Sequence, residues 1–197
     1  MSGAMIERSC AKRTCLLMVQ PWSLYPEISA EVLSCAGKLK KRGVLIACLT
    51  SADSAPEEFI KVSDASFFMR TGIFGRLTGI SKKDAARLCP EIVFLGSDYA
   101  EFVPLFDGLL GKRGIDHVLV VGGFKEDCVL AVAKSLCRIS RIKGLKIRLV
   151  ERLLMSGYKP YSGREFPNRI ASYSQASGCD ISVLKSDPEA IYLKYFK

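Results

Sequence analysis

The sequence lacks the residue spacings on which most small metal and redox sites depend. It has one histidine among 197 residues, and none of its eight cysteines forms a Cys-x-x-Cys pair. Zinc knuckles and thioredoxin-type motifs need such spacings, so we predict no metal ion and no cofactor. Apolar runs reach only about five to seven residues, well short of the ~20 residues of a membrane-spanning helix. The first 13 residues also lack the apolar core of a secretory signal.

The overall composition is that of a globular protein. Apolar residues make up 49% of the chain and charged residues 25%, which is ordinary for such proteins. The length suits one well-buried domain. We therefore expect a flexible basic N-terminus over 1–13 and one domain over 14–197. A core of this size does not need a disulfide framework, so we expect a reducing intracellular compartment. Arg8, Lys12 and Arg13 hint at mitochondrial targeting, or form only a basic start.

Short continuous apolar runs alternate with amphipathic segments along most of the chain. Because the runs do not alternate apolar with polar residues, both faces of the sheet should be covered, which is typical of parallel α/β proteins. We predict a single-domain three-layer αβα sandwich with a mostly parallel six-stranded sheet. Residues 59–80 are predicted as an irregular excursion. Predicted strands are 14–19, 44–49, 91–95, 118–121, 145–150 and 181–184, and predicted helices are 27–42, 102–110, 128–142, 165–176 and one from 188.

The most informative stretch is 118–133, which predicts a buried strand, a glycine turn and a cysteine at a helix start. Free backbone N–H groups and the helix dipole at such a position favour a thiolate, so Cys128 is a candidate nucleophile. Glu126 and Asp127 flank it and should raise the pKa of the thiol, an effect that Lys125 partly offsets.

This layout resembles the isochorismatase-like (cysteine hydrolase) superfamily. The resemblance covers nearly the whole chain, from residue 14 to about 193, and rests on Gly122–Leu130 and on the Arg113-Gly114-Ile115-Asp116 lead-in. It implies that the cysteine attacks a carbonyl or imine carbon. It also implies an aspartate base after the first strand, a lysine before the third helix and, in nicotinamidase-like members, a metal held by an Asp-x-His pattern.

The sequence departs from this family pattern at two catalytic positions. Gln20 stands where the aspartate belongs, and an amide cannot accept a proton as a carboxylate does. Gly96 stands where the lysine belongs. The metal segment offers only Asp53, and His117 precedes its strand, at the wrong end for a Cys–His dyad. Cys128 is then a relic nucleophile, unless Asp53, Asp98 or Glu101 replaces the base.

The formal net charge of +9 suggests an acidic partner. Lys134, Arg138 and Arg141 follow an i, i+4, i+7 spacing in the predicted helix, and Lys143 and Lys146 come next. These residues form either a solvated basic face or a docking surface for an acidic protein subunit, RNA or anionic lipid headgroups.

Together these features predict a catalytically inactive isochorismatase-like protein, acting as a structural or binding subunit of a larger, perhaps mitochondrial-matrix, assembly. Two alternatives stay open: an active cysteine hydrolase that uses Cys128 with a displaced base, and an RNA-binding module. Family members often form oligomers, so a homo-oligomer is open as well.

Overall fold

The computed structural model describes residues 13–20, 26–51, 57–69, 87–95, 99–156 and 165–186. Strands and helices alternate through most of this part of the chain, as predicted. In order they are β1 (Thr14–Val19), α2 (Pro26–Lys41), β2 (Leu45–Ser51), α3 (Glu57–Val62), β3 (Ala65–Met69), β4 (Glu91–Phe94), α5 (Tyr99–Arg113), β5 (His117–Phe124), α6 (Cys128–Ile139), β6 (Lys146–Met155), α7 (Glu165–Ser177) and β7 (Asp180–Leu184).

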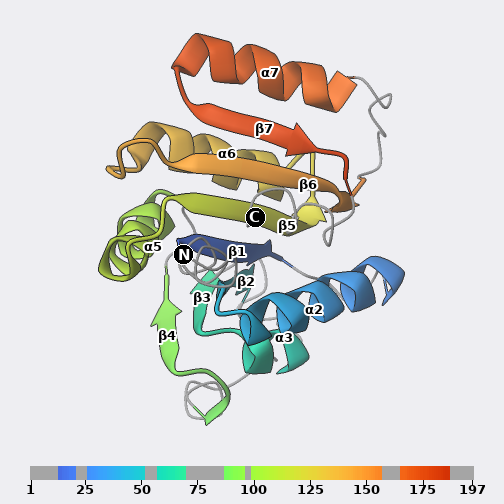
Figure 1. Cartoon of the computed structure of the whole chain (residues 1–197), viewed down its shortest axis with the longest axis vertical. Helices are drawn as coiled ribbons and strands as arrows, with labels where there is room; N and C mark the ends of the chain where they lie inside the picture. Colours follow the sequence, from blue (N-terminus) through green and yellow to red (C-terminus); the bar gives the residue numbers. More distant parts are fainter. Residues whose placement is uncertain are drawn as a thin grey trace, which may run out of the picture.

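All seven strands form one parallel sheet in the order β4-β3-β2-β1-β5-β6-β7. The chain winds outward from β1 to β4 and then outward from β5 to β7, as Figure 1 shows. The order of strands therefore reverses between β1 and β5. In open α/β sheets, ligands bind outside the carboxyl ends of the strands at such a switch point.

Helices cover both faces of the sheet, which gives three layers. Leu16 and Met18 of β1 belong to a core shared with α2 and α3. The alternate residues Cys15, Leu17 and Val19 belong to a larger core shared with α5, α6 and α7. Both sets are fully buried, so the predicted α/β sandwich and the predicted continuous apolar strands are confirmed.

The prediction of six strands is wrong, because the described part of the chain alone forms seven. The additional strand is β3, which lies inside the segment 59–80 that was expected to be irregular. Its five residues are all buried, and their apolar pattern was hidden by the nearby Gly72, Gly75 and Gly79. The helix α3 also extends into that segment.

Helix α6 ends at Ile139, short of the predicted end at residue 142. Asp107 of α5 explains this. One carboxylate oxygen accepts the Ser140 hydroxyl at 2.8 Å, and the other accepts the backbone N–H of Arg141 at 2.7 Å. These bonds give the chain leaving the helix an alternative to further helical hydrogen bonds, so Arg141 lies beyond α6 and not on its basic face.

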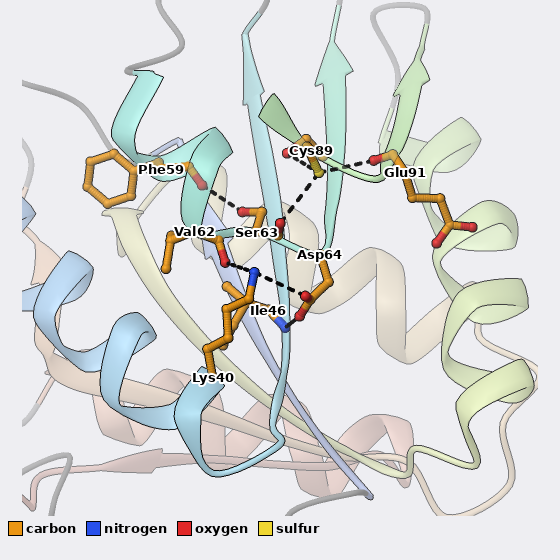
Figure 2. Close-up of polar contacts among 9 residues, drawn as sticks. Lys40, Ile46, Phe59, Val62, Ser63, Asp64, Cys89 and Glu91 are labelled. Atoms are coloured by element: carbon orange, nitrogen blue, oxygen red, sulfur yellow. Dashed lines mark hydrogen bonds and ion pairs between the residues drawn. The ribbon is translucent and has the colours of Figure 1, made fainter. Parts of the chain in front are cut away.

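A polar junction joins α2, α3 and β2 at the amino-end edge of the sheet (Figure 2). The Lys40 ammonium donates to the carbonyl oxygen of Val62 at 2.9 Å and lies 3.2 Å from Asp64. Asp64 accepts the backbone N–H of Ile46 at 2.9 Å. The Lys40 side chain thus caps the end of α3. It also pairs with Asp64, the residue that accepts a backbone N–H at the start of β2.

The buried Cys89 ties β4 to this junction. Its thiol lies 3.6 Å from the carbonyl oxygen of Ser63 and 3.4 Å from that of Glu91 (Figure 2). Cys89 therefore acts as a small apolar residue with a weak donor.

The structure contains a disulfide between Cys137 and Cys179. The sequence did not predict this bridge, because the two cysteines are 42 residues apart and belong to no spacing motif. Cys15, Cys35, Cys48, Cys89 and Cys128 are free thiols. In the described ranges, no helix combines the length and the apolar character needed to cross a membrane.

Candidate active site

Gln20 and Cys128 lie at the switch point of the sheet. Gln20 directly follows β1 and Cys128 begins α6, just after β5. The two strands are neighbours, with Val19 opposite Gly122. The position predicted for a base and the position predicted for a nucleophile therefore share the carboxyl-end edge of the sheet.

Two glycines let the cysteine reach the end of β1. A Cβ on Gly122 would lie 2.6 Å from the Val19 carbonyl oxygen, and the backbone there has a φ of +93°. A Cβ on Gly123 would lie 2.5 Å from the Cys128 sulfur and 2.9 Å from the same carbonyl oxygen. Any side chain at Gly123 would occupy the space of the thiol, so the sulfur rests directly on the glycine backbone.

Backbone N–H groups surround the sulfur of Cys128. The residue is 3% exposed, and the N–H of Phe124 donates to Sγ at 3.1 Å. Asp127, which precedes the helix, makes no side-chain hydrogen bond to cap it. The predicted helix-start geometry is therefore present.

Burial nevertheless decides the state of the thiol. Loss of solvent raises the pKa of Cys128 to about 11. Hydrogen bonds from backbone N–H groups, led by that of Phe124, act in the opposite direction, and the Asp127 carboxylate adds to the increase. With a pKa of about 11, only about one thiol in ten thousand is ionised at pH 7. Burial therefore favours the neutral thiol of Cys128 over the thiolate.

Gln20, at the position predicted for a base, has a distorted backbone. Gln20 has a φ of +40°, in the left-handed region that residues other than glycine seldom adopt. Its N–H donates to the carbonyl oxygen of Leu49 at 2.6 Å, which holds the end of β1 against β2. Strained backbone of this kind clusters at functional sites.

Tyr99, which the sequence analysis missed, also belongs to this site. It is the first residue of α5. Burial raises the pKa of its phenol, and the nearby Cys128 and Asp127 raise it further. A second neutral group thus lies near the thiol, and no motif spacing in the sequence indicated it.

Two of the other residues considered for catalysis, Lys125 and Glu101, lie within the described part of the chain. The Lys125 ammonium, expected to favour the thiolate, lies 3.9 Å from Glu151 of β6 and 5.8 Å from the ring centre of Phe166. Glu101 is exposed on α5. Gly96, Asp53 and Asp98 lie outside the described residues.

His117 is the first residue of β5 and so lies at the amino end of the strand, away from Cys128, as expected. Its Nδ1 is 2.7 Å from Asp116, which also pairs with Arg13. Partial burial raises the pKa of Asp116. The hydrogen bonds from His117 and Arg13 outweigh this effect and hold that pKa below its usual range. This histidine therefore belongs to a surface ion network.

The structure resembles several hydrolases, although no protein-family model matches the sequence and no curated protein matches it. N-carbamoylsarcosine amidase of Thermoplasma acidophilum shares 17% identity at a TM-score of 0.52, over 89% of this chain and 97% of its own. The nicotinamidase of Staphylococcus aureus shares 19% at 0.51, over 86% and 97%. A cysteine hydrolase of Pseudomonas syringae pv. phaseolicola shares 12% at 0.54, over 94% and 93%.

The chain has the isochorismatase-like fold. In this chain the fold brings the glycine turn and Cys128 to the switch point of the sheet. At these levels of identity, the likeness concerns architecture and not chemistry.

A metal site of the nicotinamidase kind has no support in the described ranges, where no group of three metal-ligating side chains occurs. The segment that would carry the ligands includes 52–56, which lies outside those ranges. We derive no chemistry through a metal.

The predicted partner-binding residues are spread along α6 and beyond it. Lys134 is half-buried, with its ammonium 5.6 Å from the ring centre of Tyr173 on α7. Arg138, Arg141 and Lys143 are exposed. Lys146 is half-buried at the start of β6, opposite Asp180 of β7. The structure therefore places three of the five cations at the surface around the end of α6.

Proposed function

We propose that this isochorismatase-like chain is not a hydrolase and serves as a binding or structural subunit of a larger assembly. The observation that carries the proposal is the state of Cys128. The thiol is buried, its pKa is raised to about 11, and Gln20 occupies the position of the base. Attack on an amide or imine carbon needs a thiolate or a base that makes one, and this arrangement favours neither.

The positive charge supports a docking role. The chain carries 29 lysines and arginines against 20 aspartates and glutamates. Arg138, Arg141 and Lys143 are exposed around the end of α6, at the opposite end of that helix from Cys128. A partner bound there would leave the thiol site untouched. Acidic protein surfaces have the charge that complements these residues.

An assay for ammonia release tests the absence of hydrolysis. The purified chain and its Cys128→Ser variant are incubated with a panel of primary amides and carbamoyl compounds. We expect both to release ammonia at the same background rate. Release by the parent chain that the serine variant abolishes would refute the proposal.

The size of the native particle tests the assembly. The chain has a mass of 21.7 kDa, and we expect it to elute from gently lysed source cells in a much larger particle. Substituting Arg138, Arg141 and Lys143 together by glutamate should release it, whereas the same change at Lys41, Lys61 and Lys112 should not. Elution as a free monomer would refute this part of the proposal.

RNA is the competing partner, and salt separates the two. Binding through phosphates weakens steeply with salt because counterions are released. If RNA is the partner, nuclease should dissociate the particle. The affinity of the chain for its partner should then also fall by orders of magnitude between low and moderate salt. We expect the particle to survive nuclease treatment.

An active cysteine hydrolase is the second candidate, favoured by the hydrogen bonds to the sulfur. The backbone N–H groups of Phe124, Val129 and Cys128 itself all lower the pKa of the thiol, against burial. A substrate that excluded Asp127 from the site would remove one opposing effect. The ammonia assay described above decides between the two candidates.

A further inference from the structure

The disulfide between Cys137 and Cys179 joins two elements that are separate in the sequence. Cys137 lies in the last turn of α6, and Cys179 lies between α7 and β7. At this place the bridge connects α6, which packs on one face of the sheet, to the unit formed by α7 and the edge strand β7 (Figure 1).

The two bridged cysteines differ from most of the other cysteines in accessibility. Cys137 and Cys179 are half-buried, whereas Cys15, Cys48, Cys89 and Cys128 are at most 3% exposed. Cys35 is also half-buried, on α2, but it forms no disulfide. A soluble disulfide or thiol can therefore reach the bridged pair more readily than it can reach the core thiols.

The unit of α7 and β7 does not depend on the bridge for its core. Phe166 and Ile170, near the start of α7, are each 1% exposed and belong to the main core. From residue 175 to 178 the chain is exposed. Opening the bridge would thus free the far end of α7 while its near end stays packed.

The turn that carries Cys179 keeps its shape through local bonds. Gly178 has a φ of +68° and donates its N–H to the carbonyl oxygen of Ser174 at 2.9 Å. The Ser174 hydroxyl donates to the carbonyl oxygen of Cys179 at 2.6 Å. A reduced Cys179 therefore keeps its local conformation, so the bridge can form again without rebuilding the turn.

A cleft of about 520 Å³ lies between α6 and α7. Its walls are formed by one face of each helix, and Lys134, one turn before Cys137, reaches across it to the ring of Tyr173. The lining residues are Leu130, Lys134, Glu165, Asn168, Arg169, Ser172 and Tyr173. Beyond the Lys134–Tyr173 contact, the bridge links the last turn of α6 to the residue that leads from α7 into β7, and so ties together the two elements that form the cleft.

We propose that Cys137 and Cys179 form a thiol–disulfide exchange site for small disulfides of the glutathione class, and that the bridge sets the shape of the α6–α7 cleft. One protein thiolate attacks the small disulfide and expels one small thiolate, which leaves a mixed disulfide. The second protein thiolate then attacks the protein sulfur of that mixed disulfide and expels the other small thiolate. Two protein thiols lose two electrons and two protons, and the small disulfide becomes two thiols.

The experiment equilibrates the folded chain in buffers with graded ratios of reduced to oxidised glutathione. Acid quenching and labelling of free thiols then show whether each cysteine is a thiol or part of a disulfide. Hydrogen exchange measures how readily the backbone N–H groups of the helices open to solvent. We expect Cys137 and Cys179 to interconvert together while the buried cysteines stay thiols. Exchange at 172–184 should speed up by at least about tenfold in the dithiol form, with β1 and β2 unchanged.

Two variants separate this site from a general effect of reduction. Cys137→Ser should show the fast exchange at 172–184 in every buffer, and Cys179→Ser should do the same if the first variant fails to fold. Cys35→Ser should respond like the parent chain. The proposal fails if the bridge in the folded chain resists the most reducing buffer. It also fails if reduction speeds exchange across the whole sheet or leaves 172–184 unchanged.

Discussion

Cys128 shows how two effects on one side chain compete. A helix start and three backbone N–H groups favour the thiolate, which is why the sequence pattern indicated a nucleophile. Burial acts in the opposite direction and is the larger effect. The sequence could place the cysteine, because glycines and an apolar strand define a turn. It could not reveal how deeply the sulfur is buried.

Tyr99 was missed for a related reason. The residue precedes the apolar pattern that predicted a helix from 102, and the helix begins at Tyr99 itself. Tyr99 comes near Cys128 because α5 packs beside α6. No local spacing carries that information.

Gly122 allows the clearest test at the scale of one residue. Alanine there would need a left-handed φ of +93° and would bring Cβ within 2.6 Å of the Val19 carbonyl oxygen. We expect Gly122→Ala to lower the free energy of unfolding by roughly 2 kcal/mol or more. Chemical denaturation followed by circular dichroism measures the change.

Gly37 provides the matched control. It lies inside α2, and a Cβ there would meet nothing within 4 Å. Gly37→Ala should therefore raise the free energy of unfolding by roughly 0.5–1 kcal/mol. Equal effects of the two substitutions would show that the approach of β5 to β1 is looser than described.

At the scale of elements, the apolar pattern of the sequence was sufficient to predict most strands and helices. The strand β3 was missed because three glycines follow it closely in the sequence. Helix α6 was predicted too long because its end depends on Asp107 of another helix. Periodicity carries local information, whereas these two boundaries are set by tertiary contacts.

The junction of α2, α3 and β2 depends on Asp64. Asp64→Ala removes the acceptor of the Ile46 N–H and the partner of Lys40. We expect a loss of about 1–3 kcal/mol in the free energy of unfolding, because a part-buried donor loses its partner. Thermal and chemical unfolding both report this loss.

Asp64→Asn keeps an acceptor oxygen, so it should lower the free energy of unfolding by less than the alanine variant does. Lys61→Ala, which removes an exposed pair with Glu57 at 2.7 Å, should change the free energy of unfolding by less than about 0.5 kcal/mol. If Asp64→Ala has no larger effect than Lys61→Ala, the junction does not hold the three elements together.

At the scale of the whole molecule, the fold was predictable and the covalent structure was not. Short apolar runs that alternate with amphipathic segments predicted a parallel α/β sandwich. The bridge between Cys137 and Cys179 depends on α7 and β7 folding back beside α6, which brings the two Cα atoms within 5.6 Å. That proximity follows only from the completed fold.

The bridge should stabilise the chain mainly by restricting the unfolded state. A cross-link between residues 42 positions apart contributes roughly 3–4 kcal/mol in the chain-entropy description. We expect Cys137→Ser to lower the melting temperature by about 10 °C while the chain remains folded at 25 °C. Scanning calorimetry measures this, with Cys35→Ser as control. An unchanged melting temperature would mean that the bridge does not form in solution.

The most direct test of the central claim is the pH dependence of Cys128 alkylation. Iodoacetamide labelling of the folded chain, resolved by mass spectrometry of peptides, gives a rate for each cysteine from pH 7 upward, and circular dichroism confirms folding. We predict that Cys128 reacts more slowly than Cys35 at pH 7, with a rate that rises toward pH 11. Asp127→Asn should shift that rise to lower pH, because the aspartate raises the pKa. Labelling of Cys128 at pH 7 far faster than of the other cysteines would contradict the account.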